Sequence, residues 1–164
     1  MYQVGIITAS DKGYAGLRED LSGPAIRKIL RNSDDFWDKE YIVLPDNQCM
    51  LESTMIKWAD VLNLDLILTT GGTGFSHRDV TPQATLNVID KRTPGIPEAM
   101  RFLSLQITPR AMLSRAEAGI RGNTLIVNLP GSPKAIAETL EYILPSIKHG
   151  LDILLDNDGE CARP

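Results

Sequence analysis

The sequence has few cysteines, few aromatic residues and no surplus of positive charge. Cys49 and Cys161 are the two cysteines among 164 residues, and two distant thiols do not form the disulfide framework of a small secreted domain. Lys and Arg number 17 against 21 Asp and Glu, so no basic surface is available to neutralise a nucleic-acid backbone. Aromatic residues make up only 5%, which is too few for platforms on which bases stack. We therefore expect no nucleic-acid partner.

Long apolar runs and a leader pattern are also missing. No apolar stretch approaches the roughly 20 residues that a membrane-spanning helix needs. The first residues, Met1 to Thr8, follow a strand pattern and lack a charged segment followed by an apolar one, so no signal peptide is predicted. We therefore expect a cytoplasmic protein without a membrane partner.

Short apolar strand patterns alternate with amphipathic helix patterns along the chain. The predicted strands are 4–8, 41–44, 64–68 and 125–129. Strands that are apolar throughout and alternate with helices indicate a mostly parallel sheet covered on both faces. An Arg121-Gly122-Asn123 turn indicates an added antiparallel hairpin, so we expect a mixed sheet. The predicted fold class is α/β, a three-layer α/β/α sandwich of Rossmann type, with one domain over 1–155 and a polar tail over 156–164.

Polar or glycine-rich segments follow each of the four predicted strands. In chain order they are Ser10-Asp11, Pro45-Asp46, Gly71-Gly72-Thr73-Gly74 and Pro130-Gly131-Ser132. The carboxyl ends of parallel strands meet at one edge of an open α/β sheet, and ligands bind there. The sequence thus predicts a binding site at this edge, formed by four loops.

The glycine-rich segment matches neither of the common phosphate-binding motifs. No Gly-Lys-Ser/Thr follows it, as a Walker A loop requires, and His77 stands where the third glycine of a dinucleotide fingerprint would be. Two interpretations stay open. The segment is either a tight turn that leaves the sheet, or a bare backbone that can approach phosphate oxygens closely.

Asp46 and Asp79 also have two interpretations each. Asp46 could be a turn residue after Pro45, and Asp79 could cap a helix that begins near Thr81. Together, two carboxylates near neighbouring strand ends would suit Mg²⁺, which takes one or two carboxylates along with substrate phosphates and water. No Cys/His cluster has the spacing of a zinc site, so no structural metal is predicted.

Five segments in chain order resemble the MogA/MoaB family of molybdenum cofactor biosynthesis. They are Thr69–Gly74, Arg78–Pro82, Ala111–Arg115, Gly119–Gly122 and Asn128–Lys134. The resemblance runs from Ile6 to about Leu155 and is closest to the molybdopterin adenylyltransferases. It implies a MogA-like fold, a homotrimer, and transfer of AMP from Mg-ATP to the terminal phosphate of molybdopterin with release of pyrophosphate. It also implies possible contact with the enzyme that inserts molybdate.

The resemblance implies residue roles as well. Asp46 and Asp79 match two aspartates that the family needs for activity, and we expect them to organise Mg²⁺. Alternatively, one of them accepts hydrogen bonds from the amino-pyrimidine edge of the pterin. The matched positions expected to bind nucleotide or pterin are Ser10, Asp11, Gly71, Gly72, Thr73, Gly74, Thr81, Ser114, Pro130, Gly131 and Ser132. A phosphate nucleophile is already deprotonated at neutral pH, so such a site needs alignment and charge neutralisation rather than a strong base.

One position departs from the pattern. Gln83 stands where bacterial relatives often have an acidic residue after Thr-Pro. This leaves two alternatives open: a MoaB-type molybdopterin-binding protein without adenylylation activity, and a trimeric assembly component that acts through protein contacts. Molybdate and tungstate are both open as the metal of the pathway.

Overall fold

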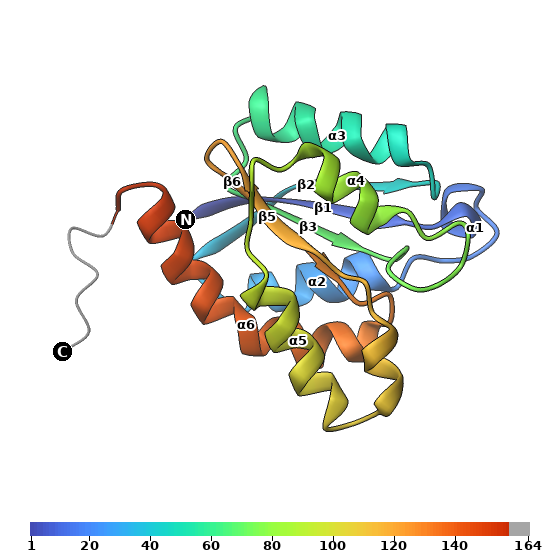
Figure 1. Ribbon diagram of the computed structural model, residues 1–164. Helices are drawn as coiled ribbons and strands as arrows, with labels where there is room; N and C mark the ends of the chain where they lie inside the picture. The colour runs from blue at the N-terminus through green and yellow to red at the C-terminus, as the bar shows by residue number, and fades with distance from the viewer. Residues whose placement is uncertain (158–164) are drawn as a thin grey trace.

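Six strands form a single mixed sheet in the order β2-β1-β3-β6-β5-β4 (Figure 1). The computed structural model describes residues 1–157, so Cys161 and most of the predicted tail lie outside the described residues. The strands are β1 (Tyr2–Ala9), β2 (Phe36–Leu44), β3 (Leu66–Thr70), β4 (Lys91–Arg92), β5 (Ala118–Arg121) and β6 (Thr124–Leu129). β2, β1, β3 and β6 are parallel, whereas β5 and β4 add antiparallel pairings. The predicted mostly parallel, mixed sheet is confirmed.

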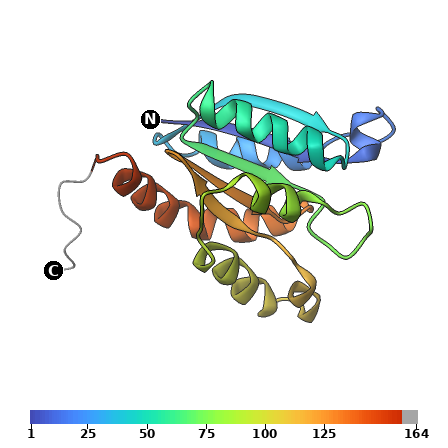
Figure 2. The same ribbon diagram turned by 45° about the horizontal axis from the view of Figure 1, so that its top comes forward.

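Helices cover both faces of this sheet (Figures 1 and 2). One face is covered by α2 (Ser22–Arg31), α5 (Gly95–Leu105) and α6 (Pro133–Leu154), and the other by α3 (Gln48–Asp60) and α4 (Thr81–Val88). Two short helices, α1 (Asp11–Tyr14) and the 3₁₀ helix η1 (Pro109–Leu113), complete the set. The result is the predicted three-layer sandwich. Among residues 1–157, none of the helices is long and apolar enough to span a lipid bilayer.

The central strands supply two separate cores because successive side chains of a strand point to opposite faces. Ile6 packs into the core under α2 and α6, while its neighbour Ile7 packs into the core under α3 and α4. Every residue of β3 and β6 is buried. This explains why these strands are apolar throughout instead of alternating with polar residues.

Strand boundaries differ from the prediction where polar residues enter a strand. β2 begins at Phe36 rather than residue 41, because an edge strand leaves one side open to water and tolerates the polar residues between. β3 ends at Thr70 rather than Leu68. Threonine is β-branched and suits a strand, and the buried Thr70 hydroxyl donates to the Pro130 carbonyl at 2.6 Å.

The parallel strands end together at one edge of the sheet. Thr8 of β1 pairs with Thr70 of β3, and Thr70 pairs with Leu129 of β6. Ala9 pairs with Leu44 at the end of β2. The four loops that follow therefore start at the same level, on the side where α1 lies in Figure 1. The prediction that these loops share one edge is confirmed.

Candidate active site

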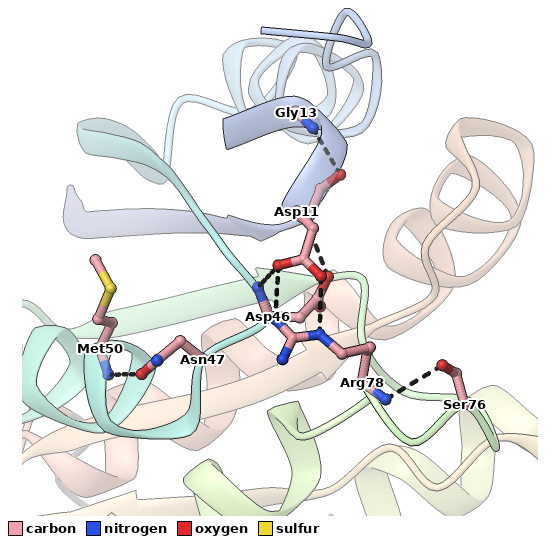
Figure 3. Close-up of polar contacts among 8 residues, drawn as sticks. Asp11, Gly13, Asp46, Asn47, Met50, Ser76 and Arg78 are labelled. Carbon is pink, nitrogen blue, oxygen red and sulfur yellow. Dashed lines mark hydrogen bonds and ion pairs between the residues drawn. The ribbon is translucent and has the colours of Figure 1, made fainter. Parts of the chain in front are cut away.

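Asp11 and Asp46 bind each other's backbone at the ends of β1 and β2 (Figure 3). The amide of Asp11 donates to Asp46 Oδ2 at 3.0 Å, and the amide of Asp46 donates to Asp11 Oδ1 at 3.0 Å. This reciprocal pair joins two loops that lie 35 residues apart. Asp46 is therefore more than a turn residue after Pro45.

Arg78 forms an ion pair with the Asp11 carboxylate of this pair. Its Nε and Nη2 atoms donate to the two carboxylate oxygens of Asp11, each at 2.9 Å (Figure 3). These bonds lower the pKa of Asp11. The pKa of Asp46 is instead raised, chiefly by burial and also by the negative charges of Asp11 and Asp79. Arg78 is outside the predicted site, since only a view in three dimensions brings it to Asp11.

Two oxygen atoms beside this pair lack a partner. Asp46 Oδ1 and Thr81 Oγ1 are buried and accept or donate no hydrogen bond within residues 1–157. Gly72 lies against both, because a Cβ atom there would be 2.4 Å from Thr81 Oγ1 and 3.1 Å from Asp46 Oδ1. Native proteins pair nearly all buried polar atoms, so these two oxygens are candidates to bind a ligand.

The glycine-rich loop begins with two residues in the left-handed region. Gly71 has φ of +89° and Gly72 has φ of +65°, which other residues rarely adopt. A Cβ atom at Gly71 would also lie 2.3 Å from the Ala9 carbonyl oxygen. Glycine is thus required twice for the chain to leave β3 close to the end of β1.

Asp79 lies on the same loop, and its capping interpretation is wrong. The N-cap of α4 is Val80, which makes no side-chain cap bond. Asp79 Oδ2 instead accepts from the amide of Ser76 at 3.1 Å, which closes a turn within the loop. The structure therefore places Asp79 in the loop, near enough for its charge to raise the pKa of Asp46.

Two pockets lie on either side of Gly131. The pocket that we call the α2 pocket has a volume of about 540 Å³ and includes the predicted residues Ser10, Gly71, Gly131 and Ser132. The α5 pocket has a volume of about 250 Å³ and includes Thr73, Ser114, Pro130 and Gly131. Seven of the thirteen predicted residues thus lie in these two cavities. The other six line neither of them: Asp11, Asp46, Gly72, Gly74, Asp79 and Thr81. A further cavity of about 470 Å³, between α2 and α6, contains no predicted residue.

The predicted serines have local structural roles. Ser10 Oγ accepts from the Gly13 amide at 3.0 Å and caps α1, while Ser132 Oγ accepts from the Ala135 amide at 3.2 Å and caps α6. Ser114 Oγ accepts from the Ala116 amide at 3.3 Å. A hydroxyl that accepts one bond can still donate its own hydrogen, so each serine keeps a donor for a ligand.

Asp20 belongs to the α2 pocket and is not among the predicted residues. It accepts hydrogen bonds from the Thr8 hydroxyl, the Tyr41 hydroxyl and the amides of Ser22 and Gly23. Burial acts to raise the pKa of Asp20, but these hydrogen bonds outweigh it and the pKa is lowered. An ionised Asp20 thus orders the start of α2. Its position two residues before Ser22 is the one signal in the sequence that could have indicated it.

Within residues 1–157, no three or more His, Cys, Asp or Glu side chains form a group that could hold a metal ion. A Mg²⁺ ion that is shared with substrate phosphates needs only one or two carboxylates.

Comparisons with known proteins identify the family and agree with this fold. The family described as "Probable molybdopterin binding domain" matches residues 5–149. The chain is 44% identical over 158 residues to the molybdopterin adenylyltransferase of Helicobacter pylori strain 26695, covering 94% of this chain and 88% of the relative. It is 43% identical over 142 residues to that of Escherichia coli K12, covering 86% and 73%. The solved structure of the molybdopterin biosynthesis enzyme MoaB from Thermus thermophilus aligns with a TM-score of 0.90 and 47% identity, covering 95% of this chain and 98% of that one. This chain therefore belongs to the MogA/MoaB family of molybdenum cofactor biosynthesis.

Proposed function

We propose that this protein is a molybdopterin adenylyltransferase. The observation that carries the proposal is the unpartnered, buried oxygen of Asp46 beside the bare backbone of Gly72, at the edge where the parallel strands end. Relatives that bear this name are 43% to 44% identical over most of the chain. The site thus combines a free carboxylate oxygen with a loop that a phosphate can approach closely.

The reaction requires little acid–base chemistry. An oxygen of the terminal phosphate of molybdopterin attacks the α-phosphorus of ATP, a new P–O bond forms, and the bond to the β-phosphate oxygen breaks. Pyrophosphate leaves with the electron pair of that bond. Because the attacking phosphate is already ionised at neutral pH, the protein's tasks are to align the two substrates and to balance their charge.

The residues present suit Mg²⁺ as the ion that accompanies ATP. Asp46 Oδ1 is a hard oxygen donor without a partner, and Asp79 uses only its Oδ2 atom in the bond from Ser76. We propose that Asp46 and Asp79 hold the ion together with substrate phosphates. When bound, it would neutralise negative charge on the phosphates of ATP.

The two pockets support a reaction with two substrates. The α2 pocket and the α5 pocket share Gly131, and the glycine-rich loop lines both, through Gly71 and Thr73. A nucleotide and a pterin could thus bind on the two sides of the loop with their phosphates meeting beside it. The predicted residues Ser10, Ser114, Pro130 and Ser132 would then contact substrate.

The assembly and location implied by the resemblance remain part of the proposal. We propose a cytoplasmic homotrimer whose product passes to an enzyme that inserts molybdate. A group of exposed apolar side chains on and after α5 supports assembly with other protein surfaces. They are Phe102, Leu105, Ile107, Met112 and Leu113.

The test is incubation of the purified protein with molybdopterin, ATP and Mg²⁺, followed by measurement of AMP-modified pterin and pyrophosphate. We expect product from the native protein and a loss of about 100-fold or more in Asp46→Asn and Asp79→Asn, as when an electrostatic contact to the transition state is removed. Asp34→Asn is the matched control, because Asp34 is exposed. Equal activity in all three variants would contradict the roles of Asp46 and Asp79.

The MoaB-type binding protein is the second candidate, and Gln83 is the observation that favours it. Gln83 is exposed on α4, two residues after Thr81. A folded protein that binds molybdopterin but makes no product would establish this alternative. Product formed only by Gln83→Glu would then identify Gln83 as the cause.

A further inference from the structure

The loop that carries Asp79 has little structure of its own. Residues 71–80 connect β3 to α4 without a regular helix or strand, and residues 75–78 are exposed. Holding such a segment in one conformation costs conformational entropy, so contacts from elsewhere must compensate. The orientation of Asp79 depends on those contacts.

Arg115 supplies them from one side. It lies between η1 and β5, and its guanidinium Nε donates to the Gly74 carbonyl at 2.7 Å. Its Nη2 donates to the Asp79 carbonyl at 2.6 Å. Its backbone amide donates to the Thr73 carbonyl at 2.9 Å. A single residue thus binds three carbonyl groups of the loop.

The guanidinium contacts of Arg115 require an arginine side chain, and they differ from those of Arg78. The planar guanidinium presents several N–H donors in fixed directions, so it can bind two carbonyls at once, whereas lysine is a point charge. Arg78 is itself part of the loop, and its side chain forms an ion pair with the partly exposed carboxylate of Asp11. The Nε and Nη2 donors of Arg115 are used by backbone carbonyls, which assigns it to the loop rather than to a substrate phosphate.

The two carbonyls bound by the guanidinium lie at the ends of the turn that holds Asp79. Inside this turn, Asp79 Oδ2 accepts from the Ser76 amide and the Asp79 amide donates to the Ser76 carbonyl. Gly74 leaves room for the carboxylate, because a Cβ atom there would lie 2.8 Å from Asp79 Oδ2. With its ends tied to Arg115, the turn can hold Asp79 in one orientation beside Asp46.

We propose that Arg115 is a positioning residue for adenylyl transfer, which holds the turn from Gly74 to Asp79 so that the Asp79 carboxylate faces the reacting phosphates. This inference rests on the proposed function. It assigns to Arg115 no contact with substrate.

The kinetic test compares Arg115→Gln and Arg115→Lys with Arg92→Gln. Arg92 also forms an ion pair, with Glu117, but it lies on β4 and binds no part of the loop. We expect kcat to fall about 100-fold in Arg115→Gln, as for a small misplacement of a catalytic group. The KM for ATP should change little, Arg115→Lys should recover part of the activity, and Arg92→Gln should match the native protein. A rise in KM with unchanged kcat, or native kcat in Arg115→Gln, would overturn the proposal.

A second measurement does not depend on activity. Amide hydrogen exchange at Ser76 and Asp79 should be at least about tenfold faster in both Arg115 variants, while exchange in β3 stays native and shows that the variants are folded. Unchanged exchange at Ser76 and Asp79 would overturn the proposal. If the native protein makes no product, the proposed function fails, and the exchange data alone decide whether Arg115 holds the turn.

Discussion

Two of the three buried side-chain oxygen atoms that lack a partner within residues 1–157 lie at the site, and the third belongs to Thr93. Asp46 Oδ1 and Thr81 Oγ1 lie beside Gly72, whereas other buried hydroxyls nearby are paired. Thr85 in the same helix accepts from Asn128 Nδ2 at 2.8 Å. An unpaired buried polar group reduces the free energy of unfolding, and such costs are typical of positions kept for function.

The substitution Thr81→Val should therefore stabilise the free protein. Valine has nearly the same shape and removes the unpaired hydroxyl, so we expect the free energy of unfolding to rise by about 1 kcal/mol. The same change should weaken binding, seen as a smaller shift of Tm on adding Mg-ATP and molybdopterin. Urea and thermal denaturation with and without these ligands measure both effects.

Thr85→Val is the matched control. It leaves the amide of Asn128 without one of its acceptors, so we expect a loss of about 1–3 kcal/mol. A similar loss in Thr81→Val would mean that the Thr81 hydroxyl already has a partner, such as a buried water molecule, and would contradict the prediction.

Asp46 should make stability depend on pH. Its raised pKa means that the folded state binds this proton more tightly than the unfolded state. The contribution of Asp46 to the free energy of unfolding is therefore most favourable below its usual pKa of 3.8 and falls as the pH rises through the folded-state pKa. At neutral pH the unfavourable effect of the buried charge is fully present.

The neutral variant Asp46→Asn tests this sign. Asn can still accept from the Asp11 amide, and it carries no charge, so we expect a higher Tm than that of the native protein at pH 7. The difference should shrink as the pH falls through the raised folded-state pKa of Asp46 and should be lost below 3.8. The Asp11–Arg78 ion pair is present in both proteins, so its pH dependence cancels when the two Tm values are compared. A lower Tm for Asp46→Asn at neutral pH would refute the prediction.

The glycine-rich loop is the element that brings these residues together. Gly72 combines a left-handed φ of +65° with close contact to Thr81, whereas Gly122 in the β5–β6 turn has φ of +53° and open space around it. Substitution of Gly122 therefore tests the left-handed backbone by itself, whereas substitution of Gly72 tests the backbone together with crowding of the new side chain.

Gly72→Ala should destabilise the protein more than Gly122→Ala does. We expect a loss of about 1 kcal/mol for Gly122→Ala, from the left-handed backbone alone. For Gly72→Ala we expect at least about 2 kcal/mol, because the methyl group also meets Thr81 Oγ1. Urea denaturation measures the free energy of unfolding of both variants. In the product assay, Gly72→Ala should be inactive and Gly122→Ala should be active. Equal losses in stability would show that Thr81 moves aside freely.

Most elements follow from local patterns, and the exceptions have physical reasons. The apolar stripe Leu51, Met55, Trp58, Ala59 and Leu62 predicts one face of α3. The first four residues are buried, whereas Leu62 lies beyond the end of the helix and is partly buried. The Arg121-Gly122-Asn123 turn predicts the hairpin of β5 and β6. The start of β2 is missed because its edge position admits polar residues, and β4 is missed because two residues carry no periodicity.

At the scale of the whole molecule, the site lies at the opposite edge of the sheet from the N-terminus and the end of α6 (Figure 1). The N-terminus lies at the start of β1, and α6 ends near it, away from α1 and the glycine-rich loop (Figure 1). Exposed apolar side chains such as Phe102, which is 70% exposed, lie on α5 instead.

The homotrimer stays a prediction at this scale. Light scattering coupled to size exclusion should give three times the chain mass of 18.1 kDa, at every protein concentration tested. Burial of exposed apolar side chains is the expected driving force. A mass equal to one chain would contradict the trimer without affecting the assignment to the family.

Local sequence patterns are sufficient for the parallel part of the sheet, the layers and the four loops at one edge, because periodicity and turn chemistry act over a few residues. The five matched segments, not periodicity, carry the resemblance to the family. They cannot show that Asp11 and Asp46 bind each other's backbone, that Asp46 and Thr81 have unpartnered oxygens, or that Arg115 holds the turn of Asp79. These contacts join residues 35 to 41 positions apart, and their geometry depends on how side chains pack after the strands align. Packing therefore decides which of the predicted polar residues are satisfied by the protein and which remain available to a substrate.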